Sequence, residues 1–150
     1  MGLKSKLESD LLTAMKNGDN TTKTTIRMIL TNMKLTEVQK GSALDDNEIL
    51  SILQKEIKSR NETISDAEKI NRTDIIDSTK AEIKVIESYL PQQMSQEELV
   101  ALVKQAITDS DAKSMSDMGK VMKIALPKIQ GRAANDMVSK AVRDLLSNNQ

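Results

Sequence analysis

Hydrophobic residues recur every three or four positions along almost the whole chain, whereas strict alternation of apolar and polar residues is nearly absent. The first spacing is that of one face of an α-helix, and the second is that of a half-buried strand. The pattern therefore predicts an all-α protein. We expect helices from Leu3 to a stop at Gly18, from Asp19 or Asn20 to Gly41, from Asp45 or Asp46 to about Ile70, from about Thr73 to Leu90, from Ser95 through Ile107, from about Ser116 to about Leu126, and from about Asn135 to Leu146.

The clearest break in this pattern lies at Pro91. Proline disfavours helical geometry in the preceding residue and cannot donate a backbone hydrogen bond, so a helix should end at Leu90. Ser95 and Glu98 then have the spacing of a capping box, which opens a new helix. The sequence thus predicts two units, a four-helix, bundle-like domain over residues 1–90 and a three-helix tail domain over residues 95–150.

The core of both units has to be built largely from aliphatic side chains. The 150 residues include no Phe, no Trp, one Tyr and nine Met. We expect Tyr89 to pack in the hinge between the units, with its hydroxyl on water. Met115, Met118 and Met122 form a helical stripe that either fills this aromatic-poor core, which we favour, or offers a surface to a partner helix.

The missing residue types narrow the chemistry. Without Cys the chain has no disulfide, no thiolate nucleophile and no zinc site of the finger type. Without His it has no Ser-His-Asp triad and no side chain that titrates near neutral pH without perturbation. We therefore expect no catalytic residue, no cofactor and no metal site. Any catalysis of its own would have to use a perturbed carboxylate or lysine.

The start of the chain does not have the pattern of a leader peptide. Its longest apolar run is Leu11-Leu12, and Glu8 and Asp10 interrupt any amphipathic leader. The sequence contains no apolar stretch of about 18 residues, so we expect no membrane span. A cytoplasmic location is the expectation that follows.

Positive charge gathers toward the C-terminal end, although the chain has 22 basic and 22 acidic residues in total. Between Met118 and Arg143 the only acidic residue is Asp136. Gly119 falls in the first turn of an expected helix, where glycine costs about 1 kcal/mol relative to alanine. Such a glycine, like Gly131 further on, permits a close backbone approach to a packed neighbour or a ligand. The basic run consists of Lys120, Lys123, Lys128, Arg132, Lys140 and Arg143.

Two interpretations of the basic run stay open. In the first, it contacts RNA phosphates while Gly119 and Gly131 allow the backbone to come close. In the second, it is an ordinary solvated face and Gly119 serves helix packing. The scarcity of aromatics removes base stacking, so an RNA contact would read shape and phosphates. Elsewhere, we expect Lys58, Arg60 and Arg72 to pair with acidic neighbours on exposed helix faces.

Short motifs follow one another at characteristic spacings over the whole chain. They are Arg27, Asp46 with Glu48-Ile49, Lys58-Ser59-Arg60-Asn61-Glu62, Asn71-Arg72-Thr73-Asp74-Ile75, Tyr89-Leu90-Pro91-Gln92-Gln93-Met94-Ser95, Asp117-Met118-Gly119-Lys120-Val121-Met122, and Pro127 through Ala133. In this order the motifs resemble the YqeY-like proteins, a family similar to the C-terminal tail domain of the B subunit of the tRNA-dependent amidotransferase. The resemblance implies a helical N-terminal bundle followed by a small three-helix tail.

The resemblance also implies a function and partners. The related amidotransferase domain is associated with tRNA contact, and a similar module is attached to some glutaminyl-tRNA synthetases. The implied function is a non-catalytic, tRNA-binding or amidotransferase-related accessory role, with tRNA, or a tRNA-charging or amidotransferase enzyme, as partner. The alternative is a protein–protein interaction module without RNA binding, resting on Met118 and Met122. A carbon–nitrogen ligase activity with glutamine as amido donor is implied by family association alone, because the chain resembles neither catalytic body.

Overall fold

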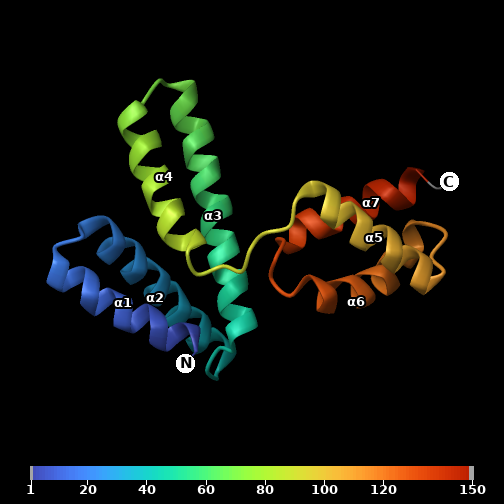
Figure 1. Ribbon diagram of the computed structural model, residues 1–150, viewed down its shortest axis with the longest axis horizontal. Coiled ribbons are helices and arrows are strands. Elements are labelled where there is room, and N and C mark those ends of the chain that lie inside the picture. Colours follow the sequence, from blue (N-terminus) through green and yellow to red (C-terminus); the bar gives the residue numbers. More distant parts are fainter. Residues whose placement is uncertain (1, 149–150) are drawn as a thin grey trace. The chain divides into compact units, whose positions relative to one another are not determined.

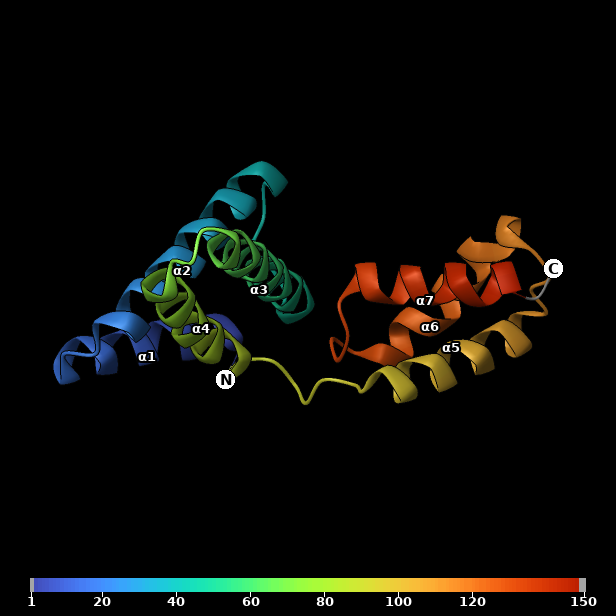
Figure 2. The same ribbon diagram turned by 90° about the horizontal axis from the view of Figure 1, so that it is seen from above.

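The structure, a computed structural model, describes residues 2–148 of the 150-residue chain. Within these residues the chain forms seven α-helices and one short 3₁₀ helix, with no strand, which confirms the all-α prediction (Figures 1 and 2). The elements are α1 (Leu3–Asn17), α2 (Asn20–Lys40), α3 (Asp46–Lys69), α4 (Thr73–Glu87), α5 (Gln96–Ser110), the 3₁₀ helix η1 (Met115–Asp117), α6 (Met118–Ile129) and α7 (Asn135–Asn148).

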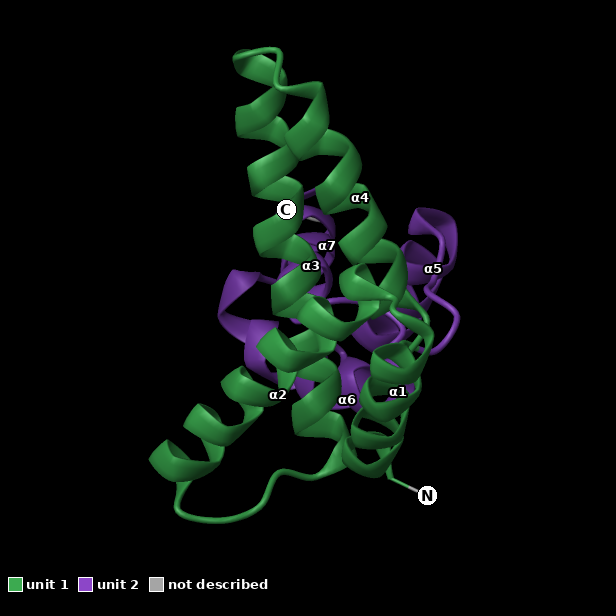
Figure 3. Ribbon diagram, turned by 90° about the vertical axis from the view of Figure 1, so that its left-hand side faces the viewer, with its two compact units in different colours: residues 1–90 green, residues 91–150 purple. Residues whose placement is uncertain are grey.

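The chain divides into two compact units, residues 1–90 and residues 91–150 (Figure 3). Unit 1 contains α1 to α4, and unit 2 contains α5, η1, α6 and α7. The segment before α5 belongs to unit 2, because the backbone N–H of Met94 donates to the carbonyl of Arg132 at 2.8 Å. The amide of Gln93 also donates to the carbonyl of Gly131 at 3.2 Å. The two domains expected from the sequence, over residues 1–90 and 95–150, stay a prediction.

Capping residues set most helix ends in unit 1. Gly18 (φ 68°) and Gly41 (φ 81°) take the left-handed conformation that ends α1 and α2. The carboxylates of Asp19 and Asp45 accept backbone N–H bonds from Thr22 at 3.1 Å and Glu48 at 2.8 Å, which opens α2 and α3. These starts and stops lie where the sequence predicts them.

The C-terminal end of α4 differs slightly from the expectation. The α-helix ends at Glu87 rather than at Leu90. The chain then tightens into a last turn in which Tyr89 N–H donates to the carbonyl of Ile86 at 3.0 Å and Leu90 N–H to that of Glu87 at 3.1 Å. Bonds between residues three apart commonly satisfy the last carbonyls of a helix.

Unit 1 is built from two helical hairpins, α1 with α2 and α3 with α4 (Figure 1). Helix α2 packs on both α3 and α4, and α1 packs on α3. The bundle-like arrangement expected for these helices stays a prediction. The buried core consists of Leu7, Ile26, Ile29, Met33, Ile49, Leu53, Ile86 and Tyr89.

Tyr89 does not have the environment that the sequence suggested. It is buried in the core of unit 1, and its hydroxyl donates to Asp10 Oδ2 at 2.5 Å. The hydroxyl, expected to reach water, bonds instead to a side chain of α1, because the turn that follows α4 lies against that helix and a buried hydroxyl needs a hydrogen-bond partner. Burial and the Asp10 carboxylate raise the pKa of Tyr89 above its ordinary value.

Arg60 is also placed differently from the expectation of an exposed helix face. Its side chain is buried (6% exposed), with Nη1 2.5 Å from Glu56 Oε2 and Nε 3.1 Å from Glu82 Oε2. Glu56 also accepts a hydrogen bond from Asn32 Nδ2. This ion cluster, in which Arg60 is buried and the two carboxylates are partly exposed, ties α3 to α4 and α2. Arg72, by contrast, is exposed and pairs with Asp74 at 3.0 Å.

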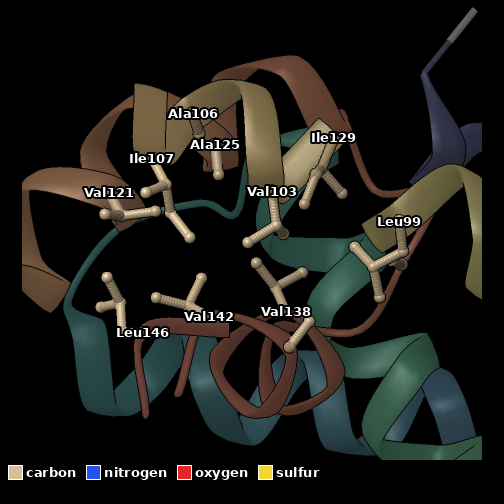
Figure 4. Close-up of a cluster of buried hydrophobic side chains, with 12 residues drawn as sticks. Leu99, Val103, Ala106, Ile107, Val121, Ala125, Ile129, Val138, Val142 and Leu146 are labelled. Carbon is tan, nitrogen blue, oxygen red and sulfur yellow. The ribbon is translucent and has the colours of Figure 1, made fainter. Parts of the chain in front are cut away.

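The core of unit 2 lies between α5, α6 and α7, whose aliphatic side chains point toward one another (Figure 4). Met115, Met118 and Met122 are partly buried against this core, in agreement with the core-filling interpretation. The buried residues of the unit 2 core include Leu99, Val103, Val121, Ile129, Val138 and Leu146.

Two helix boundaries in unit 2 correct or qualify the expectation. Pro127 does not end α6, since the helix continues through it to Ile129. A proline in the last turn removes a single backbone bond, and the burial of Ile129 offsets that loss. At the start of α5, Ser95 Oγ accepts the Glu98 N–H at 3.1 Å, while the Glu98 carboxylate accepts a bond from Arg132.

Candidate nucleic-acid interface

The N-terminus of α6 has no side-chain cap. Asp117 precedes it, but its carboxylate accepts the backbone N–H of Lys113 at 3.0 Å instead of bonding into the helix. That hydrogen bond, together with the nearby Lys120 ammonium, lowers the pKa of the Asp117 carboxyl. The positive end of the α6 dipole is therefore not closed by a side-chain hydrogen bond.

Gly119 stands in the first turn of α6 with open space around it. Apart from its two chain neighbours and the nearby backbone of α6, no atom in the described part of the chain comes within 4 Å of the position that a Cβ on Gly119 would take. Tight helix packing is therefore not the reason for this glycine, which corrects the second interpretation above. Its helical position still costs about 1 kcal/mol relative to alanine, and the open space leaves room for a ligand to approach the backbone.

Lys120 and Lys123 lie on the side of α6 that faces away from the core. Successive residues of an α-helix are rotated by about 100°, so both lysines point away from the buried Val121. Lys120 Nζ lies 3.7 Å from Asp117 Oδ1, but its side chain is 71% exposed, so the pair contributes little. Lys123 is exposed and has no ion pair within residues 2–148. We call Gly119, Lys120 and Lys123 the α6 patch.

Lys128 and Arg132 are engaged inside unit 2. Lys128 Nζ lies 3.4 Å from Asp109 Oδ2 on α5. Arg132 Nε donates to the carbonyl of Gln92 at 2.8 Å, and its Nη2 donates to Glu98 Oε2 at 3.0 Å. Arg132 thus joins the segment before α5 to the loop before α7, a structural role that the sequence did not indicate.

Lys140 and Arg143 lie on the exposed side of α7, next to carboxylates. Asp136 is one helical turn before Lys140, and Asp144 follows Arg143 directly, so this side is charge-balanced. Because three helices surround one core, the exposed sides of α6 and α7 point in different directions. The basic run is therefore divided between surfaces and does not form one continuous patch.

Gly131 has a conformational role that the structure makes visible. It has φ 76° and follows Gln130 at φ 50°, so two consecutive residues turn the chain after α6. A left-handed conformation is unfavourable for residues with a side chain, and glycine adopts it without that cost. Its carbonyl accepts the Gln93 amide, which ties this turn to the start of unit 2.

A cavity in unit 1 is a second feature that the sequence did not reveal. It has a volume of about 420 Å³ and lies against α1, the start of α2 and the end of α4. Its lining includes Asp10, Asp19, Lys84 and Tyr89. Both carboxylates already accept hydrogen bonds from unit 1, Asp10 from Tyr89 and Asp19 from Thr22. The Thr22 bonds lower the pKa of Asp19.

Residues 2–148 contain neither a cluster of metal-binding side chains nor a membrane-spanning helix. No group of three or more His, Cys, Asp or Glu side chains in that range could hold a metal ion. None of the helices described there is long and apolar enough to cross a bilayer.

The fold and the site together define a class of protein. It is all-helical, consists of two units, and has its candidate site on a small basic helix surface. Residues 4–146 match the family model described as Yqey-like protein. The chain therefore belongs to the YqeY-like family, as the ordered motifs indicated.

Comparison with curated proteins finds relatives in fungi. The chain is similar to "Altered inheritance of mitochondria protein 41, mitochondrial" of Kluyveromyces lactis, with 37% identity over 107 residues, covering 69% of this chain and 57% of the relative. It matches the protein of the same name in Lachancea thermotolerans with 32% identity over 131 residues, covering 85% of this chain and 68% of the relative. The chain thus spans little more than half the length of the first of these relatives.

The names of these relatives overturn the expectation of a cytoplasmic location. Each is named as a mitochondrial protein, as is a relative in Pyrenophora tritici-repentis with 26% identity over 144 residues. These relatives are named for mitochondria and not for the cytoplasm. The expectation rested on the absence of a leader pattern, and such an absence does not identify a compartment.

Proposed function

We propose that this protein is a non-catalytic accessory protein that binds tRNA through the α6 patch of unit 2. The observation that carries the proposal is Gly119, a glycine in a helical turn with open space around it. Two exposed lysines share its side of the helix, and no side chain caps the helix end beside it. Family membership supports the choice of tRNA through the likeness to the amidotransferase tail domain.

The chemistry of such a contact is electrostatic. Lys120 and Lys123 neutralise RNA phosphates and release condensed counterions, so the affinity falls as salt concentration rises. Gly119 lets a phosphate approach the first turn of α6, where the helix dipole favours an anion, although the Met118 N–H already donates to the Met115 carbonyl of η1. The contact reads shape and charge rather than base identity.

The remaining members of the basic run have subordinate roles in this proposal. Lys140 and Arg143 contribute a separate, charge-balanced surface on α7. Lys128 and Arg132 maintain the structure of unit 2 through Asp109 and Glu98. Replacement of Lys120 and Lys123 is therefore the most direct test.

The test measures binding of the full chain to total tRNA at low salt by fluorescence anisotropy. We expect the double variant Lys120→Ala, Lys123→Ala to bind about tenfold more weakly and to have a salt slope shallower by about two. The matched control removes the same charge from unit 1, where Lys16 and Lys55 are exposed. Lys16→Ala, Lys55→Ala should bind like the original chain.

Two results would overturn the proposal. One is undetectable tRNA binding by the original chain at low salt. The other is an equal loss of affinity in the unit 1 control, which would mean that net charge alone, and not the α6 patch, attracts the RNA.

The alternative function, a protein–protein interaction module, rested on two methionines that the sequence suggested as contact residues. Met118 and Met122 are partly buried against the core of unit 2 rather than presented as a surface. No observation on unit 2 favours the carbon–nitrogen ligase alternative. A protein partner would have to use a different part of the molecule.

A further inference from the structure

Helix α2 carries a second apolar stripe on its solvent-facing side. Met28, Leu35 and Val38 are 46%, 57% and 73% exposed, respectively. The buried residues of the same helix, such as Ile26 and Ile29, face the core of unit 1 from the opposite side. Met28 Sδ lies 3.8 Å from Arg60 Nη2 of α3, whereas the core of unit 1 does not account for the exposed Leu35 and Val38.

The exposed stripe has the spacing of a coiled-coil seam. Thr24, Met28, Thr31, Leu35 and Val38 are separated alternately by four and three residues. A heptad repeat with apolar residues at positions a and d has this alternation, and it presents a continuous seam to a second helix. Met28 and Leu35 fall at a, and Thr24, Thr31 and Val38 fall at d. We call these five residues the α2 seam.

A row of cations borders the α2 seam on one side only. Lys23, Arg27 and Lys34 fall on the same edge of the helix, and Arg27 and Lys34 occupy consecutive g positions. None of the three makes an ion pair with another residue between 2 and 148; Arg27 Nη2 instead lies 4.0 Å from Met15 Sδ. The opposite border, at the e positions, carries the uncharged Asn32 and Gln39 and has no such row.

Two carboxylates near α2 are engaged elsewhere, and a third, Glu8 of α1, lines a cavity together with Lys34 without forming an ion pair with it. Glu37, the only acidic residue of α2, accepts Lys4 Nζ at 3.3 Å on the side facing α1. Glu56 on α3 belongs to the ion cluster around Arg60. The positive edge of the α2 seam is therefore not neutralised from within unit 1.

Charge selects the occupant of this seam. A two-fold axis along the helices would set two α2 helices parallel, with Arg27 and Lys34 facing the uncharged e residues Asn32 and Gln39 of the other copy, so neither cation would gain a carboxylate. A two-fold axis perpendicular to the helices would set them antiparallel, with their g positions facing each other. Arg27 and Lys34 would then lie opposite the same residues of the other copy, and like charges in such positions repel. An acidic helix, in contrast, would place carboxylates opposite both cations while covering the apolar seam.

We propose that the α2 seam docks an acidic amphipathic helix of a partner protein. The apolar ridge of the partner covers Met28, Leu35 and Val38, and its carboxylates face Arg27 and Lys34. The threonines at Thr24 and Thr31 add little apolar area, so the complex is reversible. This surface lies in unit 1 and does not involve the α6 patch, so its test is independent of the proposed tRNA binding.

The test uses the full chain and a labelled synthetic peptide as probe. The acidic peptide has three heptads, Leu at a and d, and Glu at e and g, so that self-repulsion keeps it monomeric. A second peptide has Lys in place of each Glu. We expect the chain to bind the acidic peptide at least tenfold more tightly than the basic peptide, as measured by fluorescence anisotropy.

Three variants locate the binding site. Leu35→Glu should weaken binding of the acidic peptide more than tenfold. The double variant Arg27→Glu, Lys34→Glu should reverse the preference toward the basic peptide. Leu12→Glu changes a residue of α1 that is equally exposed (61%) but lies outside the seam, and it should bind like the original chain. Circular dichroism checks that all three stay folded.

Several outcomes would overturn the proposal. They include no binding of the acidic peptide, and equal binding of both peptides, which would indicate unselective apolar adhesion. Self-association of the chain that Leu35→Glu abolishes would assign the seam to a second copy. Binding to anionic phosphatidylglycerol vesicles that depends on Leu35 and exceeds the peptide binding would assign it to a lipid surface.

Discussion

Helices α2 and α6 both present exposed basic residues to solvent, yet the neighbours of those residues differ. On α2, Arg27 and Lys34 border an exposed apolar stripe that ends at Val38. On α6, Lys120 and Lys123 stand beside an open glycine at the start of the helix. The first combination fits another helix, and the second fits a phosphate. Both proposals therefore rest on the chemistry next to each cation and not on the number of cations.

Two further cations, which are buried or partly buried, differ from the exposed cations of α2 and α6. Arg60 in unit 1 and Arg132 in unit 2 are engaged by carboxylates and carbonyls of their own unit. We expect their loss to reduce stability, whereas loss of the exposed cations should reduce binding. The following variants separate these two effects.

The largest expected effect comes from Arg60→Ala. This change leaves Glu56 and Glu82 without their cation in a largely buried site, so we expect a loss of about 3 kcal/mol in the free energy of unfolding. Urea-induced unfolding followed by circular dichroism measures the loss. Arg72→Ala, which removes an exposed pair, should cost less than about 1 kcal/mol. Equal costs for the two variants would contradict the distinction.

Arg132→Ala should have an intermediate effect on stability and little effect on RNA. The variant loses the bonds to the Gln92 carbonyl and the Glu98 carboxylate, and we expect a cost of about 1–2 kcal/mol. Urea unfolding and tRNA anisotropy on the same sample give both quantities. Unchanged stability combined with a tenfold loss of tRNA affinity would move Arg132 from the structural group into the RNA contact.

Gly119→Ala should change stability and binding in opposite directions. Apart from the adjacent residues and the nearby backbone of α6, a Cβ at this position meets no described atom within 4 Å, so alanine should stabilise α6 by about 0.5–1 kcal/mol. The same Cβ would obstruct a phosphate approaching the first turn, so tRNA affinity should fall. A variant that is more stable and binds tRNA unchanged would show that the glycine does not serve the ligand.

The smallest expected effect is the titration of Asp74. The Arg72 guanidinium holds the pKa of this exposed carboxyl at about 2. A carboxyl with a lower pKa in the folded than in the unfolded chain adds stability above the unfolded value, and that contribution is lost as the pH falls through the folded value. The relevant window here lies between about pH 4 and pH 2. Carboxyl NMR should give the low pKa, and Arg72→Ala should return it toward the ordinary range.

Much of the fold followed from local signals in the sequence. Glycines and capping aspartates end or begin a helix through bonds to residues only a few positions away in the sequence. The roles of Gly18, Gly41 and Asp45 could therefore be predicted without knowledge of packing. The prediction that α6 ends before Pro127 is wrong, because the net cost of a proline near a helix end depends on whether the residues after it are buried. Ile129 is buried, and this fact belongs to the tertiary structure.

The candidate sites were less accessible to sequence reasoning. Arg60 lies in register with Ile57 and Ile64 on the apolar stripe of α3, and that register was an available signal of its burial. The basic run looked continuous in sequence, but the structure divides it between exposed surfaces and internal contacts. The sequence did not indicate the exposed apolar stripe of α2, because the buried residues of that helix already account for its helical spacing.

The sequence by itself determined that this chain is helical, where most helices begin and end, and to which family it belongs. These properties depend on periodicity, capping and ordered motifs, which act over a few residues. Only the tertiary structure decided which cations are engaged, why Gly119 is not needed for packing, and that α2 has an uncovered apolar side. Those properties depend on residues distant in sequence, such as Arg132 and Gln92, or Arg60 and Glu82, which become neighbours only when the helices pack.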